Sequence, residues 1–379
     1  MRRHDIDFIR VVVFGLLMLY HASLIFGTRG WLLHTDSPNR IFDLISLITH
    51  PWRISLLFLI AGISTAMLAK RLSPIDLCGM RSRQLIPPLL FGIFVLVPPQ
   101  IYIEAKTDFG LDMSYFDFWA IYLRFGTIDD PNRVPTSLLS LQHLWFIAYL
   151  WFYTAVLTFL LVAAGPWLAR LTSRLSVSFR GHGLIVWPIL CLAALRLTVY
   201  PITGETMDVR TDWYTHIVCF GFFAVGYLIA HDDRFWADVV AWRCQATCIA
   251  ALSLALIIGL FFLYPPGERG LAVTMLHRTG RSAFQWSMIV AILGICRVSI
   301  TAPHPVISYL NRAILSYYVM HQTVMLVFAY WLKQTFGLGN ASFVLIIAAT
   351  AAGCMLIYEV QRRTIRLLKR VGGLGAATA

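Results

Sequence analysis

Residues 8–27 of this 379-residue chain read FIRVVVFGLLMLYHASLIFG, an almost unbroken apolar run. A helix of about 20 residues, rising about 1.5 Å per residue, matches a hydrocarbon core about 30 Å thick. The run therefore predicts a membrane-spanning helix. Two ionisable side chains, Arg10 and His21, interrupt it. Such groups within a membrane normally face a bundle interior or a water-filled cavity.

Nine further apolar windows follow, and the whole chain is 58% hydrophobic and 13% charged, with a mean hydropathy of +0.71. Backbone polar groups in hydrocarbon must be satisfied within their own segment, so each window predicts a helix. The ten windows lie at about 8–27, 44–68, 85–103, 143–163, 184–203, 213–231, 246–264, 283–300, 307–332 and 341–360. We expect an all-α polytopic membrane protein with about ten transmembrane helices, folded as a single integral-membrane domain over residues 1–379.

The net charge of +12 is distributed unevenly between the two sides of this expected topology. With a cytoplasmic N-terminus, the cytoplasmic segments hold about nineteen basic against seven acidic residues, and the opposite side about ten against twelve. This positive-inside pattern predicts that both termini are cytoplasmic. It also explains the charge without nucleic acid, which we do not expect as a partner.

The remaining features give weaker signals. The N-terminal run is long and has no obvious small-residue cleavage site, so we expect a retained helix rather than a signal peptide. The seven cysteines show no CxxC or CxxH spacing, and no histidine pair has ligand spacing, so we expect no metal. The loop over residues 104–142, with an amphipathic segment around 114–126, either shapes a site or is a solvated connector.

Several polar side chains fall within the apolar windows. Eleven residues at about 100° each place Arg10 and His21 on one helix face, about 16 Å apart along the axis. Asp7, one turn before Arg10, can pair with it. We expect the outer halves of the helices to bring four histidines and two arginines to one cavity: His21, His50, His143, His321, Arg53 and Arg196.

Two arginines, Arg81 and Arg83, precede the pair Pro87 and Pro88. Prolines within a helix remove hydrogen bonds and clash with the preceding turn, so we expect them to break the helix and to hold both guanidinium groups in one direction. Histidine is the usual general base near neutral pH. A membrane histidine can instead serve only as a hydrogen-bonding group between helices, and the sequence leaves this alternative open for His50, His143 and His321.

Asp7-Phe-Ile-Arg10, followed by His21 after ten residues, resembles the first helix of the integral-membrane family 3 acyltransferases. Phe58-Leu-Ile-Ala-Gly62 resembles the aromatic signature of their second helix, with Ala61 where the family has serine. Arg83, four residues before Pro87, also fits their pattern. Within the family, the glucan biosynthesis protein C group is the most similar, on the segments His21-Ala-Ser-Leu-Ile, His50-Pro-Trp-Arg53 and His143-Leu-Trp145-Phe.

This resemblance implies transfer of an acyl group from cytosolic acyl-CoA to a sugar at the outer side of a bacterial inner membrane. For the glucan group it implies succinylation of osmoregulated periplasmic glucans. By position, His21 is then the catalytic histidine and Arg10 its essential partner. The other matching positions line the donor or acceptor site.

The charges and side-chain chemistry of the chain are compatible with the implied acyl transfer. The phosphates of CoA would stay at the basic cytoplasmic face near Arg10, Arg81 and Arg83, while His21 takes a proton from a sugar hydroxyl. Arg53 or the indole N–H of Trp145 would stabilise the oxyanion. A succinyl group would need a further cation, for which Arg53 and Arg196 are candidates.

Alternatives remain open at this stage. They are an acetyl donor, another envelope polysaccharide as acceptor, a transporter or flippase, and a glycosyl- or phosphotransferase. We expect acyl-CoA (succinyl-CoA or acetyl-CoA) as a donor substrate, and no permanently bound cofactor. The lipid bilayer and a glycan are the expected partners, and the sequence does not define the oligomeric state.

Overall fold

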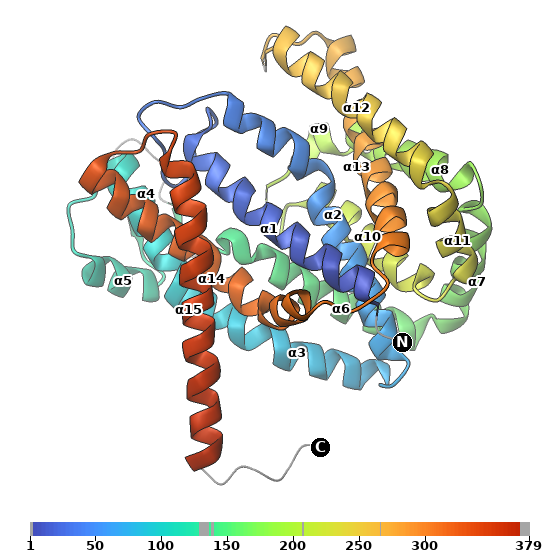
Figure 1. The fold of residues 1–379 in the computed structure, drawn as a ribbon, viewed down its shortest axis with the longest axis horizontal. Helices are drawn as coiled ribbons and strands as arrows, with labels where there is room; N and C mark the ends of the chain where they lie inside the picture. The colour runs from blue at the N-terminus through green and yellow to red at the C-terminus, as the bar shows by residue number, and fades with distance from the viewer. Residues whose placement is uncertain (1–2, 129–135, 138–139, 207, 266, 372–379) are drawn as a thin grey trace. The chain divides into compact units, whose positions relative to one another are not determined.

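A computed structural model describes residues 3–128, 136–137, 140–206, 208–265 and 267–371. Nearly all of them are helical, which confirms the predicted all-α class (Figure 1). The strands among the described residues are a two-residue antiparallel pair, β1 (Thr127–Ile128) with β2 (Thr136–Ser137), and the remaining residues form turns and loops. The α-helices are α1 (His4–Phe26), α2 (Ile41–Ala69), α3 (Pro74–Phe91), α4 (Val97–Phe109), α5 (Tyr115–Leu123), α6 (Trp145–Ala163), α7 (Gly165–Ser178), α8 (Gly183–Thr198), α9 (Tyr200–Thr203), α10 (Trp213–Ile229), α11 (Asp233–Ala241), α12 (Arg243–Leu263), α13 (Leu271–Ser299), α14 (Pro305–Phe336) and α15 (Ser342–Val371). A π-helix, η1 (Gly92–Leu96), joins α3 to α4, and a 3-10 turn, η2 (Gln142–Leu144), precedes α6.

Nine helical segments in the described part of the chain are long and apolar enough to cross a membrane. The number rises to ten if α10 and α11, which meet at a bend of 112°, are counted together as one broken span. About ten spans were predicted, and each predicted window coincides with one of these segments. The cytoplasmic placement of both termini stays a prediction.

The prediction that Pro87 and Pro88 break their helix is wrong, because α3 continues to Phe91. Prolines deprive the carbonyls four residues earlier of their helical donors. Those residues, Arg83 and Gln84, lie on an exposed face of α3. The irregularity instead follows the prolines, as the π-helix η1, and the third helical segment extends over Pro74–Phe109 rather than 85–103.

Two amphipathic helices, α7 and α11, lie between the predicted windows and were not foreseen. Helix α11 begins at Asp232, whose carboxylate accepts hydrogen bonds from the backbone N–H groups of Arg234 and Phe235, at 3.0 and 3.2 Å. It buries Phe235 and Trp236. The amphipathic segment predicted around 114–126 is present as α5, which Ser114 caps by accepting from the N–H of Asp117.

The chain forms two compact units, which we describe separately. Unit 1 comprises residues 1–17, 44–87 and 145–311. Within it, α12 and α8 pack against α13 (Figure 1). Helices α2 and α10 approach each other most closely at glycines: a Cβ added to Gly62 would lie 2.0 Å from the carbonyl oxygen of Phe223, and one added to Gly226 would lie 2.1 Å from that of Leu59.

Unit 2 comprises residues 18–43, 88–144 and 312–379. A buried polar ladder joins α4 to α14 within it. The Gln100 side chain donates to Thr323 Oγ1 (2.8 Å) and accepts from Gln322 Nε2 (2.9 Å). Thr323 in turn donates to the carbonyl of Leu96, at the end of η1, at 2.7 Å. The ladder thus ties α4 and α14 to the backbone at the end of η1. The prediction of a single domain stays a prediction.

Candidate functional site

Arg10, on α1 in unit 1, is held by three polar side chains. Its Nη1 donates to Asn311 Oδ1 (2.9 Å), and its Nη2 donates to Ser64 Oγ (2.8 Å). Asp7 forms the expected ion pair with Arg10 at 3.5 Å, and its Oδ1 also accepts from Asn311 Nδ2 (2.9 Å). Asn311 therefore bridges the cation and its counter-ion, which fixes the plane of the guanidinium group.

The hydroxyls that contact the arginines lie one turn beyond Ala61. Ser64 reaches Arg10, and Thr65 Oγ1 accepts from Arg81 Nη2 at 3.2 Å. Arg83, by contrast, is exposed on α3. The expectation that Arg81 and Arg83 point in one direction is wrong, because residues two apart in a helix are separated by about 200°.

Three predicted histidines meet in unit 2. His21 stacks on Trp31, with ring centroids 5.3 Å apart and planes at 20°. Its ring centroid is also 5.3 Å from that of His321, which in turn is 5.2 Å from that of His143. We call His21, His143 and His321 the histidine cluster. It joins the C-terminal half of α1 to η2 and the middle of α14.

Backbone carbonyls define the proton positions of two of these rings. His143 Nε2 lies 3.1 Å from the carbonyl oxygen of Val319, and His321 Nδ1 lies 2.7 Å from that of Tyr318. A carbonyl only accepts, so these two nitrogens carry the protons. In these tautomers the lone pairs lie on His143 Nδ1 and His321 Nε2. The Tyr318 hydroxyl donates to the carbonyl of His143, which ties η2 to α14.

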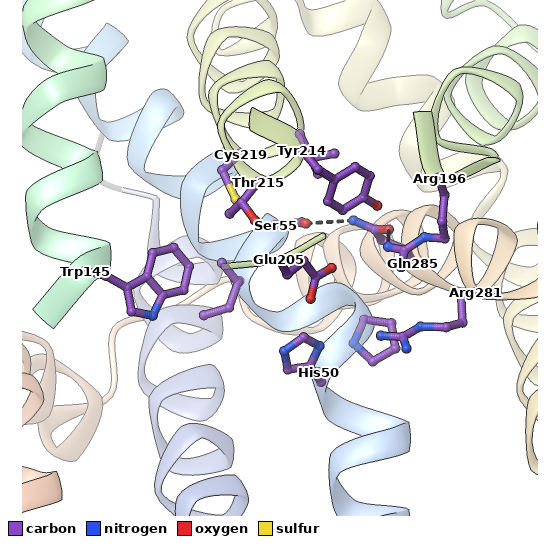
Figure 2. A pocket seen from close by; sticks show the side chains of 13 residues that line it. His50, Ser55, Trp145, Arg196, Glu205, Tyr214, Thr215, Cys219, Arg281 and Gln285 are labelled. Carbon is purple, nitrogen blue, oxygen red and sulfur yellow. Dashed lines mark hydrogen bonds between the residues drawn. The ribbon is translucent and has the colours of Figure 1, made fainter. Parts of the chain in front are cut away.

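A pocket lies within unit 1, with an empty volume of about 520 Å³ that includes space open to solvent. Figure 2 shows the side chains that converge on it from α2, α6, α8, α10 and α13. Three predicted site residues, His50, Trp145 and Arg196, are among them. Its lining is completed by Pro51, Ile54, Ser55, Glu205, Tyr214, Thr215, Val218, Cys219, Arg281 and Gln285.

The six residues expected to share one cavity thus fall into groups. His21, His143 and His321 form the histidine cluster in unit 2, whereas His50 and Arg196 line the pocket in unit 1. Arg53 is 1% exposed and donates from Nη1 to Thr49 Oγ1 at 3.0 Å, on its own helix, and it does not line the pocket. That all six share one cavity stays a prediction. Over the residues that the structure describes, no group of three histidine, cysteine or acidic side chains is placed to hold a metal ion.

Several contacting residues were missed from the sequence. Asn311 and Ser64 are polar residues in apolar windows, a signal that we applied only to ionisable side chains. Trp31 lies in a loop, where tryptophan near a membrane surface is common and carries no signal. Arg281 was missed because the window 283–300 begins two residues after it, whereas α13 begins at Leu271.

The chain is also similar in sequence to known proteins. The acyltransferase family 3, described as "Acyltransferase domain", matches residues 3–359. Glucans biosynthesis protein C of Salmonella typhi is 26% identical over 159 residues, which are 41% of this chain and 38% of that protein. The protein of the same name from Salmonella typhimurium gives the same values. The aligned part thus spans well under half the length of these relatives. No solved structure matches the chain. Because the family match runs through nearly all of the described helices, the chain belongs to the family 3 acyltransferases.

Proposed function

We propose that this protein is a transmembrane O-acyltransferase. It moves an acyl group, with succinyl favoured over acetyl, from cytosolic acyl-CoA to a hydroxyl of a periplasmic glycan, and it resides in a bacterial inner membrane. The acceptor we favour is an osmoregulated periplasmic glucan, since the relatives that match are named for glucan biosynthesis. His21 is the general base, and Arg10 binds the donor.

The observation that carries this proposal is the histidine cluster. An imidazole that accepts a proton from a hydroxyl must be neutral and held in place. Trp31 stacks on one face of His21, and the tilted ring of His321 lies against it. His321 is fully buried, and its Nδ1 proton is committed to the Tyr318 carbonyl, so its Nε2 lone pair is turned to other partners. Two neighbouring imidazoles can pass a proton from one to the other when their nitrogens come within hydrogen-bond distance.

The reaction then follows from the roles assigned. The sugar hydroxyl gives its proton to His21 as its oxygen forms a bond to the thioester carbonyl carbon. The resulting tetrahedral intermediate collapses, the carbon–sulfur bond breaks, and CoA leaves as a thiol after His21 returns the proton. Arg53 or the Trp145 indole N–H is our candidate donor to the oxyanion.

Arg10 is suited to an anionic donor because its guanidinium is already oriented. Asp7 carries one negative charge next to it. The neutral side chains of Asn311 and Ser64 accept hydrogen bonds from Arg10 Nη1 and Nη2, and Asn311 also donates to Asp7. A guanidinium oriented in this way can bind a phosphate through its fork geometry. Arg81, hydrogen-bonded to Thr65 on the same helix as Ser64, and the exposed Arg83 add positive charge for the CoA phosphates.

The experiment is the replacement His21→Ala, with acyl substitution of periplasmic glucans measured by mass spectrometry in a strain that lacks the native enzyme. Loss of a general base predicts a fall of at least about 100-fold. His34→Ala is the matched control, because His34 lies in the same unit but is part-exposed and pairs with Asp108 at 3.6 Å. Both variants must be present in the membrane at wild-type abundance. Normal glucan acylation by His21→Ala would refute the catalytic assignment.

A further inference from the structure

The pocket in unit 1 contains two guanidinium groups from different helices. Arg196 comes from α8 and is 4% exposed, and Arg281 comes from α13. Figure 2 shows both side chains approaching from the same side of the pocket. Arg196 is oriented by a short relay: its Nη2 donates to Gln285 Oε1 (3.1 Å), and Gln285 Nε2 donates to Ser55 Oγ (2.8 Å).

The protein neutralises the two guanidinium groups only in part, because Glu205 is the one carboxylate among the residues that line the pocket. The Nε atoms of Arg196 and Arg281 are both buried without a hydrogen-bond partner among the described residues. Within the same residues, Arg281 makes no hydrogen bond or ion pair at all. A buried cation without a partner is strongly unfavourable, so it is normally paired in the state that functions. The positions of these groups therefore indicate a bound anion.

The charge of the lining limits which anion fits. Glu205 is the acidic residue of the pocket, it is exposed, and it forms no ion pair within 4.0 Å with either arginine in the described part of the chain. Two guanidinium groups and one carboxylate give these three side chains a formal net charge of +1. A monoanion restores neutrality, whereas a phosphate dianion leaves an excess negative charge beside Glu205.

The rest of the lining is apolar or aromatic: Pro51, Ile54, Val218 and the rings of Trp145 and Tyr214. Such a surface suits a short hydrocarbon chain. The buried hydroxyl of Tyr214 has no hydrogen-bond partner in the described residues and adds one more donor to the site. The ligand that matches both parts of the pocket is a short apolar chain with one terminal carboxylate.

We propose that this pocket selects a dicarboxylic acyl group, whose free carboxylate is bound by Arg196 and Arg281. The inference rests on the proposed function and narrows its acyl group to the dicarboxylic class. We assign the acyl group of the proposed donor as the molecule that carries this carboxylate into the pocket.

The first arm of the test measures binding to the purified full-length protein by calorimetry. The probe is succinamate, which carries one carboxylate and an amide in place of the thioester, and the comparison ligands are propionamide and inorganic phosphate. We expect succinamate to bind most tightly. Arg281→Gln should weaken its binding by at least about tenfold, because a charge-assisted hydrogen bond is lost. Arg281→Lys should fall between the two.

Arg278→Gln is the matched control. Arg278 is one turn earlier on α13, stacks on Tyr200 at 5.3 Å and does not line the pocket, so its replacement should leave succinamate binding unchanged. Arg281→Gln removes an unpaired buried cation, so the ligand-free variant should be at least as heat-stable as wild type. Wild-type affinity for succinamate in Arg281→Gln, or preferential binding of phosphate, would overturn the site.

The second arm measures the ratio of kcat/KM for succinyl-CoA to that for acetyl-CoA. We expect this ratio to fall by at least about tenfold in Arg281→Gln and to stay unchanged in Arg278→Gln. A variant that loses succinamate binding but keeps the ratio would overturn the assignment of the acyl group as ligand. If wild type transfers neither acyl group, the proposed function fails, and the binding arm alone still decides whether the pocket is a carboxylate site.

Discussion

The ring of His321 stands edge-on to that of His143, with centroids 5.2 Å apart and planes at 88°. Each ring donates to a backbone carbonyl of α14, and the two carbonyls belong to consecutive residues, Tyr318 and Val319. The backbone of α14 thus sets the tautomers of both rings. A substitution that preserves the donor and removes only the lone pair separates a structural role from a catalytic one.

His321→Asn makes this separation. The asparagine amide nitrogen lies where Nδ1 was and can still donate to the Tyr318 carbonyl, but nothing replaces Nε2. We expect the melting temperature to stay close to wild type and glucan acylation to fall by at least about tenfold. His321→Leu, which loses both functions, should in addition be less stable. Full activity in a stable His321→Asn protein would make this ring a packing element of α14.

Asn311→Leu tests how Arg10 is held. The change removes the acceptor of Arg10 Nη1 and the donor to Asp7 at nearly constant volume. A misoriented guanidinium should raise KM for acyl-CoA by about tenfold, with a smaller effect on kcat. Steady-state kinetics with saturating glucan measure both parameters. Asn340→Leu, at an exposed position, is the control, and an unchanged KM in Asn311→Leu would separate Asn311 from donor binding.

Gly62→Ala tests the contact between α2 and α10. Its new methyl group would lie 2.0 Å from the Phe223 carbonyl oxygen, so the helices must separate. We expect a loss of about 1–3 kcal/mol or more in the free energy of unfolding. Gly221→Ala, on α10, has open space around the added Cβ and should be neutral or slightly stabilising. Thermal unfolding in detergent compares the two. Equal melting temperatures would contradict this close packing.

Tyr122→Phe tests a pH effect outside the spans. Burial raises the pKa of Tyr122 on α5 to about 12, and its hydroxyl donates to the Ile93 carbonyl at 2.9 Å. The folded-state pKa is above the ordinary value of about 10. The protonated form therefore stabilises the fold below that value, and this contribution is lost as pH rises through about 10–12. Denaturant unfolding at pH 8 and pH 11 should show a smaller alkaline loss in Tyr122→Phe than in wild type. An identical loss in both proteins would assign the pH effect to other groups.

The spans and the two central ionisable residues were predictable because placing unsatisfied backbone groups or unpaired charges in hydrocarbon is unfavourable in free energy. Hydrocarbon requires helices of a given length, and it admits Arg10 or His21 only with partners. The meeting of His21, His143 and His321 followed from placing them at similar depths. The contact of Trp31 with His21 could not be predicted in this way, because the position of a loop residue along the membrane normal does not follow from a hydropathy window.

Other features depend on information that a linear pattern lacks. The continuation of α3 through Pro87 and Pro88 is decided by which face of the helix is exposed, and hydropathy windows do not show it. Arg281 lay outside its window because α13 begins with polar turns. Short amphipathic helices such as α7 were read as connections, since their apolar residues are too few to register as spans.

The reciprocal contacts of Gly62 and Gly226 have a mechanical consequence. With each glycine seated against a carbonyl of the other helix, α2 and α10 have no layer of side chains between them that can slide or re-pack. We therefore expect α2 and α10 to move together as one rigid pair during turnover. We also expect Ser55 on α2 and Tyr214 on α10 to keep their spacing, and the motion that admits and releases substrates to come from the helices that pack on this pair.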